Sequence, residues 1–303
     1  MLLDQRSAGV RQVTVILNAR AGALSNPQLE EQIRAAFQVA GWSTQFKVCG
    51  KSVRPDRLAR EAVANGDRIL IAAGGDGTVS AVAGAVIGTE AILGVLPVGT
   101  LNHFAKDMKI PLDLKAAVAV IQKGETAEVD VGEVNGRVFV NKSSLGLYPS
   151  MVFERDLHRR TGHNKWVAMF WACVTVLRRF RSVRVRLNIH GQTSLRKTPF
   201  VFIGNNEYRI EGLQAGTRAS LKQGRLSLYI AQPASRLRLI WLSLLPLFGR
   251  LRTAKDFEMF RVDETSIEPH RKKIRISLDG EIAALHTPLR YRIRPGALRV
   301  FVP

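Results

Sequence analysis

The first 130 residues alternate short apolar runs with longer segments of helical periodicity. Runs rich in Val, Ile and Leu predict strands, and segments whose apolar residues recur every three or four positions predict helices. The expected strands are residues 13–17, 44–48, 68–73 and 92–96, and the expected helices are residues 26–40, 57–64 and 78–86. Such alternation is typical of a parallel sheet with helices on its faces, where ligands bind at the carboxyl ends of the strands.

The pattern changes after about residue 130, where polar and apolar residues alternate within short runs. The expected strands there are residues 129–134, 138–141, 183–189, 200–203, 226–230, 257–262, 273–278 and 298–302. Alternation of this kind favours a mainly antiparallel β-sandwich. The sequence therefore predicts an α/β domain in residues 1–130 and a β-rich domain in residues 131–303, with two helical insertions near residues 150–181 and 235–250.

One expected strand leads directly into a glycine-rich turn. Residues 70–79 read Leu-Ile-Ala-Ala-Gly-Gly-Asp-Gly-Thr-Val. Glycines at this point allow a tight turn and a close approach of backbone N–H groups to a phosphate, and the following helix start adds a favourable dipole. Asp76 supplies a carboxylate, the ligand type that Mg²⁺ prefers. The sequence has no Gly-x-x-x-x-Gly-Lys-Ser/Thr segment, so an ordinary P-loop is excluded.

Three further segments follow one another in a recognisable order. They are Asn18-Ala-Arg-Ala-Gly22, Leu96-Pro-Val-Gly-Thr-Leu-Asn-His-Phe-Ala-Lys-Asp107 and Asp279-Gly280-Glu281. Together with Gly-Gly-Asp-Gly-Thr, they resemble the motifs of the superfamily that contains diacylglycerol kinases, sphingosine kinases and NAD kinases. The second segment is similar to the Pro-x-Gly-Thr-x-Asn-Asp-Phe-Ala block of the lipid kinase branch, whereas NAD kinases carry a different sequence there. The resemblance to the diacylglycerol-kinase-like lipid kinases of bacteria covers nearly the whole chain.

The resemblance implies a kinase that uses ATP and Mg²⁺ to phosphorylate a lipid hydroxyl, with the active site in the cleft between the domains. The implied ATP-binding residues are Asn18, Ala19, Arg20, Ala21, Gly22, Gly74, Gly75, Asp76, Gly77, Thr78, Val79, Ser80, Gly99, Thr100 and Asn102. Asp76 would also contact Mg²⁺ through the bound nucleotide. Glu281 is assigned the role of the base that accepts the hydroxyl proton, with Asp279 left open as the alternative. The structural alternative for Asp279-Gly280 is a hairpin turn.

The chain departs from the family's pattern in three places. His103 stands where the family has Asp, so one carboxylate expected near Mg²⁺ is absent. Tyr148-Pro149 replaces a polar pair, which leaves the substrate preference open. Gln223 replaces an Asp in a loop where relatives bind a structural Mg²⁺, so the loop offers a cation only neutral oxygens. The candidate ligands of this loop are Ser220, Gln223 and Arg225.

The positive charge lies mostly in the second half. The sequence has a net charge of +20, with +3 in residues 1–120 and +17 in residues 121–303. A basic half favours a polyanionic partner, and apolar insertions with basic ends fit an anionic membrane surface. Ordinary core-packing helices and a solvated surface are the plain alternative, and nucleic acid is disfavoured because aromatic interleaving is thin. The basic ends contain Arg178, Arg179, Arg181, Arg236, Arg238, Arg250 and Arg252.

The remaining bulk features favour a cytoplasmic protein at the inner face of the membrane. Cys49 and Cys173 are the two cysteines, so no disulfide framework is expected. The N-terminal residues lack the pattern of a signal peptide. The apolar stretches at residues 166–177 and 239–248 are shorter than the roughly 20 residues of a spanning helix. Homodimerisation is left open.

Two rival functions remain beside an active kinase for diacylglycerol, phosphatidylglycerol or a sphingoid-like lipid. A catalytically lapsed relative that binds nucleotide or lipid would explain His103 and Gln223, but Asp76, Asp279 and Glu281 argue against it. An NAD kinase is disfavoured by the Gly-Thr-Leu-Asn block that starts at residue 99.

Overall fold

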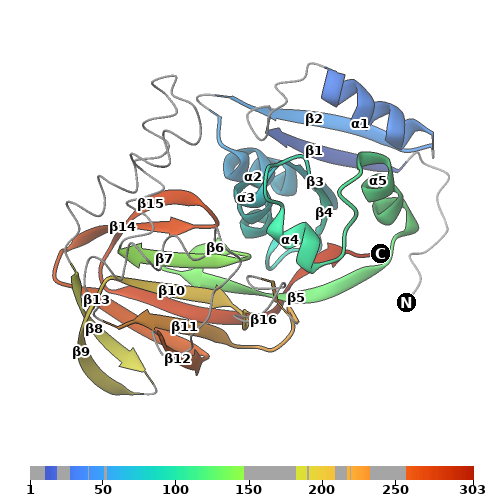
Figure 1. Ribbon diagram of the computed structural model, residues 1–303. Helices are drawn as coiled ribbons and strands as arrows, with labels where there is room; N and C mark the ends of the chain where they lie inside the picture. Colours follow the sequence, from blue (N-terminus) through green and yellow to red (C-terminus); the bar gives the residue numbers. More distant parts are fainter. Residues whose placement is uncertain are drawn as a thin grey trace, which may run out of the picture. The chain divides into compact units, whose positions relative to one another are not determined.

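The computed structural model divides the chain into two compact units, Met1–Glu128 with Leu298–Pro303, and Val129–Ala297 (Figure 1). The structure describes residues 11–18, 28–39, 41–50, 53–146, 182–189, 191–208, 217–218, 220–232 and 257–303. The expected division assigned the whole C-terminus to the second domain. The structure instead groups its last residues with the first unit, because Val300 pairs with Leu93 and Val302 N–H donates to Glu125 O at 3.0 Å.

The first unit is built on a parallel sheet. Its strand order is β2-β1-β3-β4, and the end of β16 pairs in parallel with β4. The elements in chain order are β1 (Gln12–Asn18), α1 (Gln28–Gln38), β2 (Ser43–Cys49), α2 (Pro55–Ala64), β3 (Ile69–Ala73), α3 (Asp76–Val86), β4 (Ile92–Leu96), α4 (His103–Asp107) and α5 (Leu114–Lys123). This order confirms the predicted parallel α/β domain.

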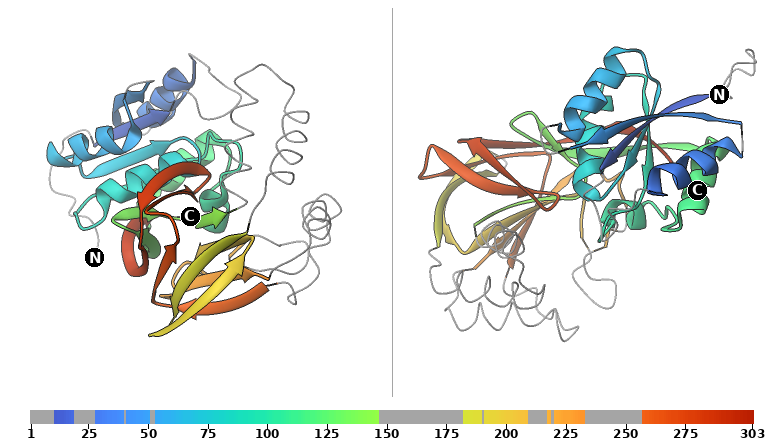
Figure 2. Two further views of the ribbon diagram at one scale, coloured as in Figure 1. Left: turned by 90° about the vertical axis from the view of Figure 1, so that its left-hand side faces the viewer. Right: turned by 90° about the horizontal axis from the view of Figure 1, so that it is seen from above.

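Helices cover both faces of this sheet. In the right-hand view of Figure 2, α2 lies on one side of the sheet and α1 and α5 lie on the other. The central strands are therefore buried on both faces, which explains why residues 70–73 of β3 are all apolar and fully buried. Local signals set the helix ends: Pro55 begins α2, and the Asp113 carboxylate accepts the N–H of Ala116 at 2.9 Å at the start of α5.

The second unit contains the antiparallel strands. One sheet has the order β12-β11-β10-β7-β14-β15, and a second group has the order β16-β13-β8-β9, with β5 beside β16 and β6 beside β5. Their bounds are β5 (Thr126–Val134), β6 (Arg137–Phe139), β7 (Lys142–Gly146), β8 (Val183–Ile189), β9 (Gln192–Thr198), β10 (Phe200–Asn205), β11 (Leu226–Ala231), β12 (Phe257–Val262), β13 (Glu264–Pro269), β14 (Lys273–Leu278), β15 (Glu281–His286) and β16 (Leu289–Phe301).

One apolar core joins the two groups of strands. Leu187, Ile267 and Tyr291 come from the β16-β13-β8 side, and Leu145 and Ile203 come from the other sheet. Tyr291 is fully buried, its hydroxyl lies 2.9 Å from the Ser143 hydroxyl, and burial raises the pKa of its phenol. Side chains of two sheets that meet in one core make a sandwich, which confirms the predicted fold class.

Several predicted features lie outside the described residues. These are the loop residues Ala19 to Gly22, the Tyr148-Pro149 pair, and the two helical insertions with their basic ends. Within the part of the chain that the structure describes, no helix combines the length and the apolar character needed to cross a bilayer.

Candidate active site

The glycine-rich turn lies where β3 ends and α3 begins. The helix starts at Asp76, two residues before the expected start at Thr78, and Gly75 is its N-cap residue. A Cβ on Gly74 would lie 2.4 Å from Thr78 Oγ1, so only glycine leaves space for the buried Thr78 side chain. Thr78 Oγ1 accepts a hydrogen bond from Asn18 Nδ2 at 3.0 Å. Two residues predicted to bind ATP, 60 positions apart, are thus in direct contact.

A second loop packs against this turn without any side chain between them. A Cβ on Gly99 would lie 2.3 Å from the Cα of Gly75 and 2.8 Å from its nitrogen. Asn102 holds this second loop in shape, because its amide donates to Pro97 O at 2.8 Å and Gly99 O at 2.9 Å. Its Oδ1 accepts the N–H of Gly99 at 3.1 Å, and its backbone has a left-handed φ of 51°. Asn102 therefore shapes the loop through contacts with the backbone.

The carboxylate of Asp76 ties the two loops together. Its Oδ2 accepts the N–H of His103 at 3.1 Å, and its Oδ1 accepts the N–H of Phe104 at 2.9 Å. Asp76 thereby provides acceptors for the first N–H groups of the short helix α4. His103 enters this contact through its backbone, so the contact does not require the aspartate that the family has at this position.

The remaining predicted ATP-binding residues differ in exposure. Val79 and Ser80 are buried, with exposed fractions of 3% and 8%, whereas Thr100 is exposed. The N–H groups of Thr78 and Val79 donate to Gly75 O at 2.9 and 3.1 Å and are therefore committed to the helix.

The acid pair lies at the hairpin between β14 and β15. Asp279 and Gly280 form its two-residue turn, with φ values of 48° and 89°, and Leu278 is paired with Glu281. Positive φ at both positions is typical of the turn that matches the twist of a hairpin. The predicted hairpin turn and the predicted acid motif are therefore the same feature.

The two acids have different surroundings. The buried Asp279 carboxylate accepts three backbone N–H groups: Val140 at 2.8 Å, Asn141 at 2.9 Å and Lys142 at 2.7 Å. Glu281 is exposed at the start of β15. The structure therefore separates the two acids by their surroundings: Asp279 is buried and accepts three backbone N–H groups, and Glu281 is exposed.

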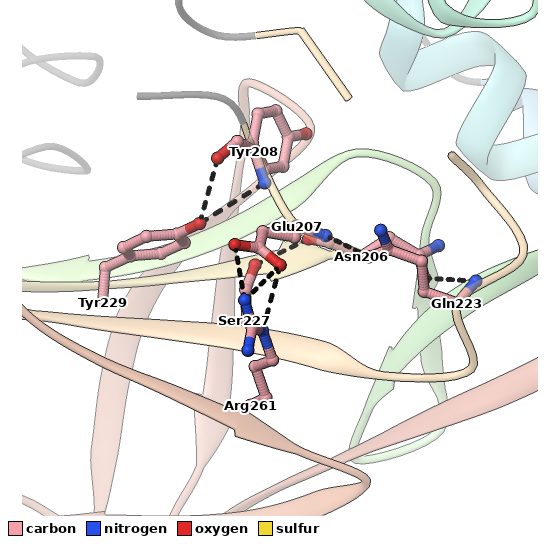
Figure 3. A network of polar contacts seen from close by, with 7 residues as sticks. All are labelled: Asn206, Glu207, Tyr208, Gln223, Ser227, Tyr229 and Arg261. Carbon is pink, nitrogen blue, oxygen red and sulfur yellow. Dashed lines mark hydrogen bonds and ion pairs between the residues drawn. The ribbon is translucent and has the colours of Figure 1, made fainter. Parts of the chain in front are cut away.

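The loop around Gln223 is closed by direct hydrogen bonds (Figure 3). Gln223 Oε1 accepts the N–H of Glu207 at 3.1 Å, and Gln223 N–H donates to Asn206 Oδ1 at 3.1 Å. The Glu207 carboxylate also receives two bonds of 3.0 Å from the Arg261 guanidinium. Nearby, Tyr229 Oη accepts the N–H of Tyr208 at 3.3 Å, and burial raises the pKa of Tyr229.

The three candidate ligands of a structural Mg²⁺ are therefore all engaged with the protein. Ser220 Oγ accepts the N–H of Lys222 at 3.1 Å, and the Arg225 carbonyl accepts the N–H of Asn206 at 3.1 Å. Together with Gln223 they form a neutral donor set, which does not fit a hard divalent cation that prefers carboxylates. Among the described residues no group of three or more His, Cys, Asp or Glu side chains could hold a metal.

Sequence reasoning missed Asp130, which braces the same region. Its carboxylate accepts the N–H of Gly224 at 2.7 Å and that of Gly296 at 2.9 Å, and its carbonyl accepts from Asn205 Nδ2 at 2.8 Å. The available signal was an acidic residue inside the apolar run of β5, because a buried charge needs partners.

The first unit is thus a parallel α/β domain with a glycine-rich turn at a strand end, and the second is a β-sandwich with an acid pair on a hairpin. Comparison with known families gives two matches. The model described as "Diacylglycerol kinase catalytic domain" matches residues 12–134, and the model described as "YegS C-terminal NAD kinase beta sandwich-like domain" matches residues 154–302.

Individual relatives agree with these matches. A Pseudomonas fluorescens protein named "Probable lipid kinase YegS-like" is 31% identical over 290 residues, which cover 91% of this chain and 92% of that protein. A Bacillus subtilis diacylglycerol kinase is 25% identical over 281 residues, or 91% of each chain. The chain therefore belongs to the family of diacylglycerol-kinase-like lipid kinases. It is a phosphotransferase with an alcohol acceptor, and membership of a kinase family implies that it uses ATP.

Solved structures share the fold at low sequence identity. The crystal structure of a diacylglycerol kinase from Bacillus anthracis str. Sterne has a TM-score of 0.69 and 17% identity, and the match covers 98% of both chains. A yeast NADH kinase complexed with NADH has a TM-score of 0.52 and 11% identity, and the match covers 98% of this chain and 84% of that one.

Proposed function

We propose that this protein is an active lipid kinase that transfers the γ-phosphate of ATP to a lipid hydroxyl with the help of Mg²⁺. The acceptors that fit the proposal are diacylglycerol, phosphatidylglycerol or a sphingoid-like lipid. The observation that carries the proposal is the close packing of the two glycine loops, in which Gly75 lies against Gly99. Asp76 of the first loop also accepts the N–H groups of His103 and Phe104, which follow the second loop. Loops that meet through backbone alone leave room for a phosphate to approach N–H groups.

In this proposal the start of α3 binds the phosphates. Because Thr78 and Val79 use their N–H groups within the helix, a phosphate at the helix start would meet the N–H groups of the residues from Gly75 to Gly77. The partial positive charge at the N-terminus of a helix stabilises an anion there. Asn18 lies beside this position through its bond to Thr78, which supports its assignment to the same site.

Asp76 fits the way in which Mg²⁺ accompanies a nucleotide. Mg²⁺ usually keeps several waters and is bound by one or two carboxylates together with the substrate's phosphates, so one carboxylate near the phosphates suffices. When bound, the ion would neutralise charge that develops on the transferred phosphoryl group. Both oxygens of Asp76 already hold N–H groups, so the carboxylate is fixed in place before a ligand arrives.

Glu281 is proposed to accept the proton of the attacking hydroxyl. A general base of this kind contributes typically 10² to 10⁴ in rate. The exposure of Glu281 at the start of β15 supports this role. The three N–H groups that the Asp279 carboxylate accepts support a structural role for Asp279 instead. The proposal also includes peripheral attachment to an anionic lipid surface at the inner face of the membrane, for which the net charge of +17 in residues 121–303 is the support.

A labelled-ATP assay against a panel of lipids in mixed micelles tests the proposed function. The panel should contain diacylglycerol, phosphatidylglycerol and sphingosine, with NAD as the soluble acceptor that an NAD kinase would use. We expect Mg²⁺-dependent labelling of a lipid, a loss of about 10²-fold in kcat for Glu281→Gln, and little change in its KM for ATP. Labelling of NAD alone, or of nothing while ATP still binds, would refute an active lipid kinase.

A further inference from the structure

Arg218 is a buried cation that holds a short backbone segment from one side. Its side chain is 7% exposed, and its guanidinium donates to Val140 O at 2.6 Å, Asn141 Oδ1 at 2.6 Å and Asn205 O at 3.2 Å. The guanidinium also lies over the Tyr208 ring, 5.4 Å from its centre. A buried guanidinium is costly unless its donors are used, so this arrangement is specific to the fork geometry of arginine.

Asp279 holds the same segment from its N–H side. Its carboxylate accepts the N–H groups of Val140, Asn141 and Lys142, and its own N–H donates to Lys142 O at 2.9 Å. Residues 140–142 thus bind a buried anion through their N–H groups, while Arg218 binds the carbonyl of Val140 and the side chain of Asn141. Linked hydrogen bonds of this kind polarise one another in a low-dielectric interior.

We propose that Arg218 is a positioning residue for the acid pair. The guanidinium fixes residues 140–142, that segment fixes the carboxylate of Asp279, and the turn at Asp279 and Gly280 places Glu281. Asp279 is then the anion that orients the turn, and Glu281 is the group that meets the hydroxyl. The catalytic part of this inference rests on the proposed lipid kinase function.

The geometry indicates how loss of the Arg218 guanidinium would change the position of Glu281. Leu278 and Glu281 are paired across the hairpin, so a shift of Asp279 moves the first residue of β15 with it. Without the guanidinium, Asn141 Oδ1 loses a 2.6 Å charge-assisted bond, and Val140 O loses one of 2.6 Å while it keeps its bond from Asn205 Nδ2 at 2.9 Å. The segment then has fewer constraints on the side opposite Asp279. A displacement of about 1 Å at a reacting group can cost on the order of 10² in rate.

Kinetics of single and double variants test the catalytic part. We expect Arg218→Gln to lower kcat by about 10- to 100-fold with KM for ATP within about twofold. Because Arg218 acts through Glu281, the kcat of the double variant Arg218→Gln with Glu281→Gln should be within about twofold of the kcat of Glu281→Gln alone. Arg218→Lys keeps the charge but not the planar fork of donors, so its kcat should lie between those of the wild type and Arg218→Gln. Arg186→Gln, which breaks an exposed ion pair with Glu268, is the matched control.

Hydrogen exchange tests the structural part without any activity. Amide exchange of residues 140–142 should be about tenfold faster in Arg218→Gln and in Asp279→Asn than in Arg186→Gln, and Arg218→Lys gives the same comparison if the glutamine variant does not fold. Defects that multiply in the double variant, or unchanged exchange at residues 140–142, would overturn the inference. A wild-type protein that labels no lipid would refute the proposed function instead, and the exchange data would still decide whether Arg218 holds the segment.

Discussion

Replacing Gly99 by alanine should separate the two glycine loops of the first unit. The backbone φ of Gly99 lies outside the left-handed region, so alanine is compatible with the local conformation and the effect comes from contact alone. The added Cβ would lie 2.3 Å from the Cα of Gly75 and 2.8 Å from both Gly75 N and Asn102 Oδ1. Two of these three atoms belong to backbone, which cannot move aside as a flexible side chain can.

The size of the effect follows from these distances. Carbon atoms in contact are normally about 3.5–4.0 Å apart, so the loops must separate by more than about 1 Å. Overpacking of this kind costs roughly 1–3 kcal/mol, which corresponds to a fall of about 4–11 °C in the unfolding midpoint of a unit this size. A misplacement of about 1 Å at the proposed phosphate site would also lower turnover by on the order of 10²-fold.

Two matched glycines make the test specific. A Cβ on Gly50 meets nothing within 4 Å, and a Cβ on Gly75 meets Gly99 Cα at 3.5 Å, an ordinary contact. Thermal unfolding of the purified variants should therefore place the midpoint of Gly50→Ala at the wild-type value, that of Gly75→Ala close to it, and that of Gly99→Ala clearly below both. Titration with ATP should give a lower affinity for Gly99→Ala than for Gly50→Ala. Equal midpoints and equal ATP affinities for Gly99→Ala and Gly50→Ala would refute the close packing of the loops.

Three further changes have defined outcomes. Asp76→Ala should abolish phosphoryl transfer and also lower the stability of the first unit by about 1 kcal/mol, because two N–H groups of α4 lose their acceptor; turnover like that of the wild type would contradict this. EDTA should leave the thermal midpoint of the nucleotide-free protein unchanged, because the Gln223 loop is closed by protein groups; a midpoint that rises with added Mg²⁺ would count against it. Burial raises the pKa of Cys49 to about 11, from an ordinary 9.0, with a smaller contribution from Asp56. The thiol therefore ionises first in the unfolded chain, and stability should fall between pH 9.0 and about 11, less so in Cys49→Ala, as urea unfolding can measure.

The parts of the fold that the sequence predicted are those where burial determines composition. Strands β1, β3 and β4 are covered on both faces, so their apolar runs were visible without any partner. Strand β9 was missed because it lies at the end of its strand order and is largely exposed, including Leu195 at 73%. Helix α4 was missed because it has five residues and depends on an acceptor from Asp76, far away in the sequence.

In the candidate site, too, the sequence revealed some features and not others. The glycine motifs named the loop residues, but the contact between Gly75 and Gly99 depends on how two loops pack, which no spacing in the sequence reveals. The acids at 279 and 281 could not be separated from the sequence, since the difference between them lies in the N–H groups of residues 140–142. Arg218 begins the loop segment that contains Gln223, but the sequence indicated no role for it, because a buried arginine is identified only by the carbonyls around it.

The departures from the family's pattern bear on whether the enzyme is active or lapsed. His103 replaces an acid, yet its backbone N–H still reaches Asp76 Oδ2, so the substitution changes a side chain and leaves the joint between the loops intact. Gln223 likewise replaces an acid, and its amide closes the loop through Glu207 and Asn206. The close contact between Gly75 and Gly99 excludes side chains from these loops and fits phosphate binding, which an active kinase and a lapsed nucleotide-binding relative would share. Both substitutions therefore remove a negative charge while keeping the loop architecture, and the feature that argues for an active kinase over a lapsed relative is the presence of Asp76, Asp279 and Glu281.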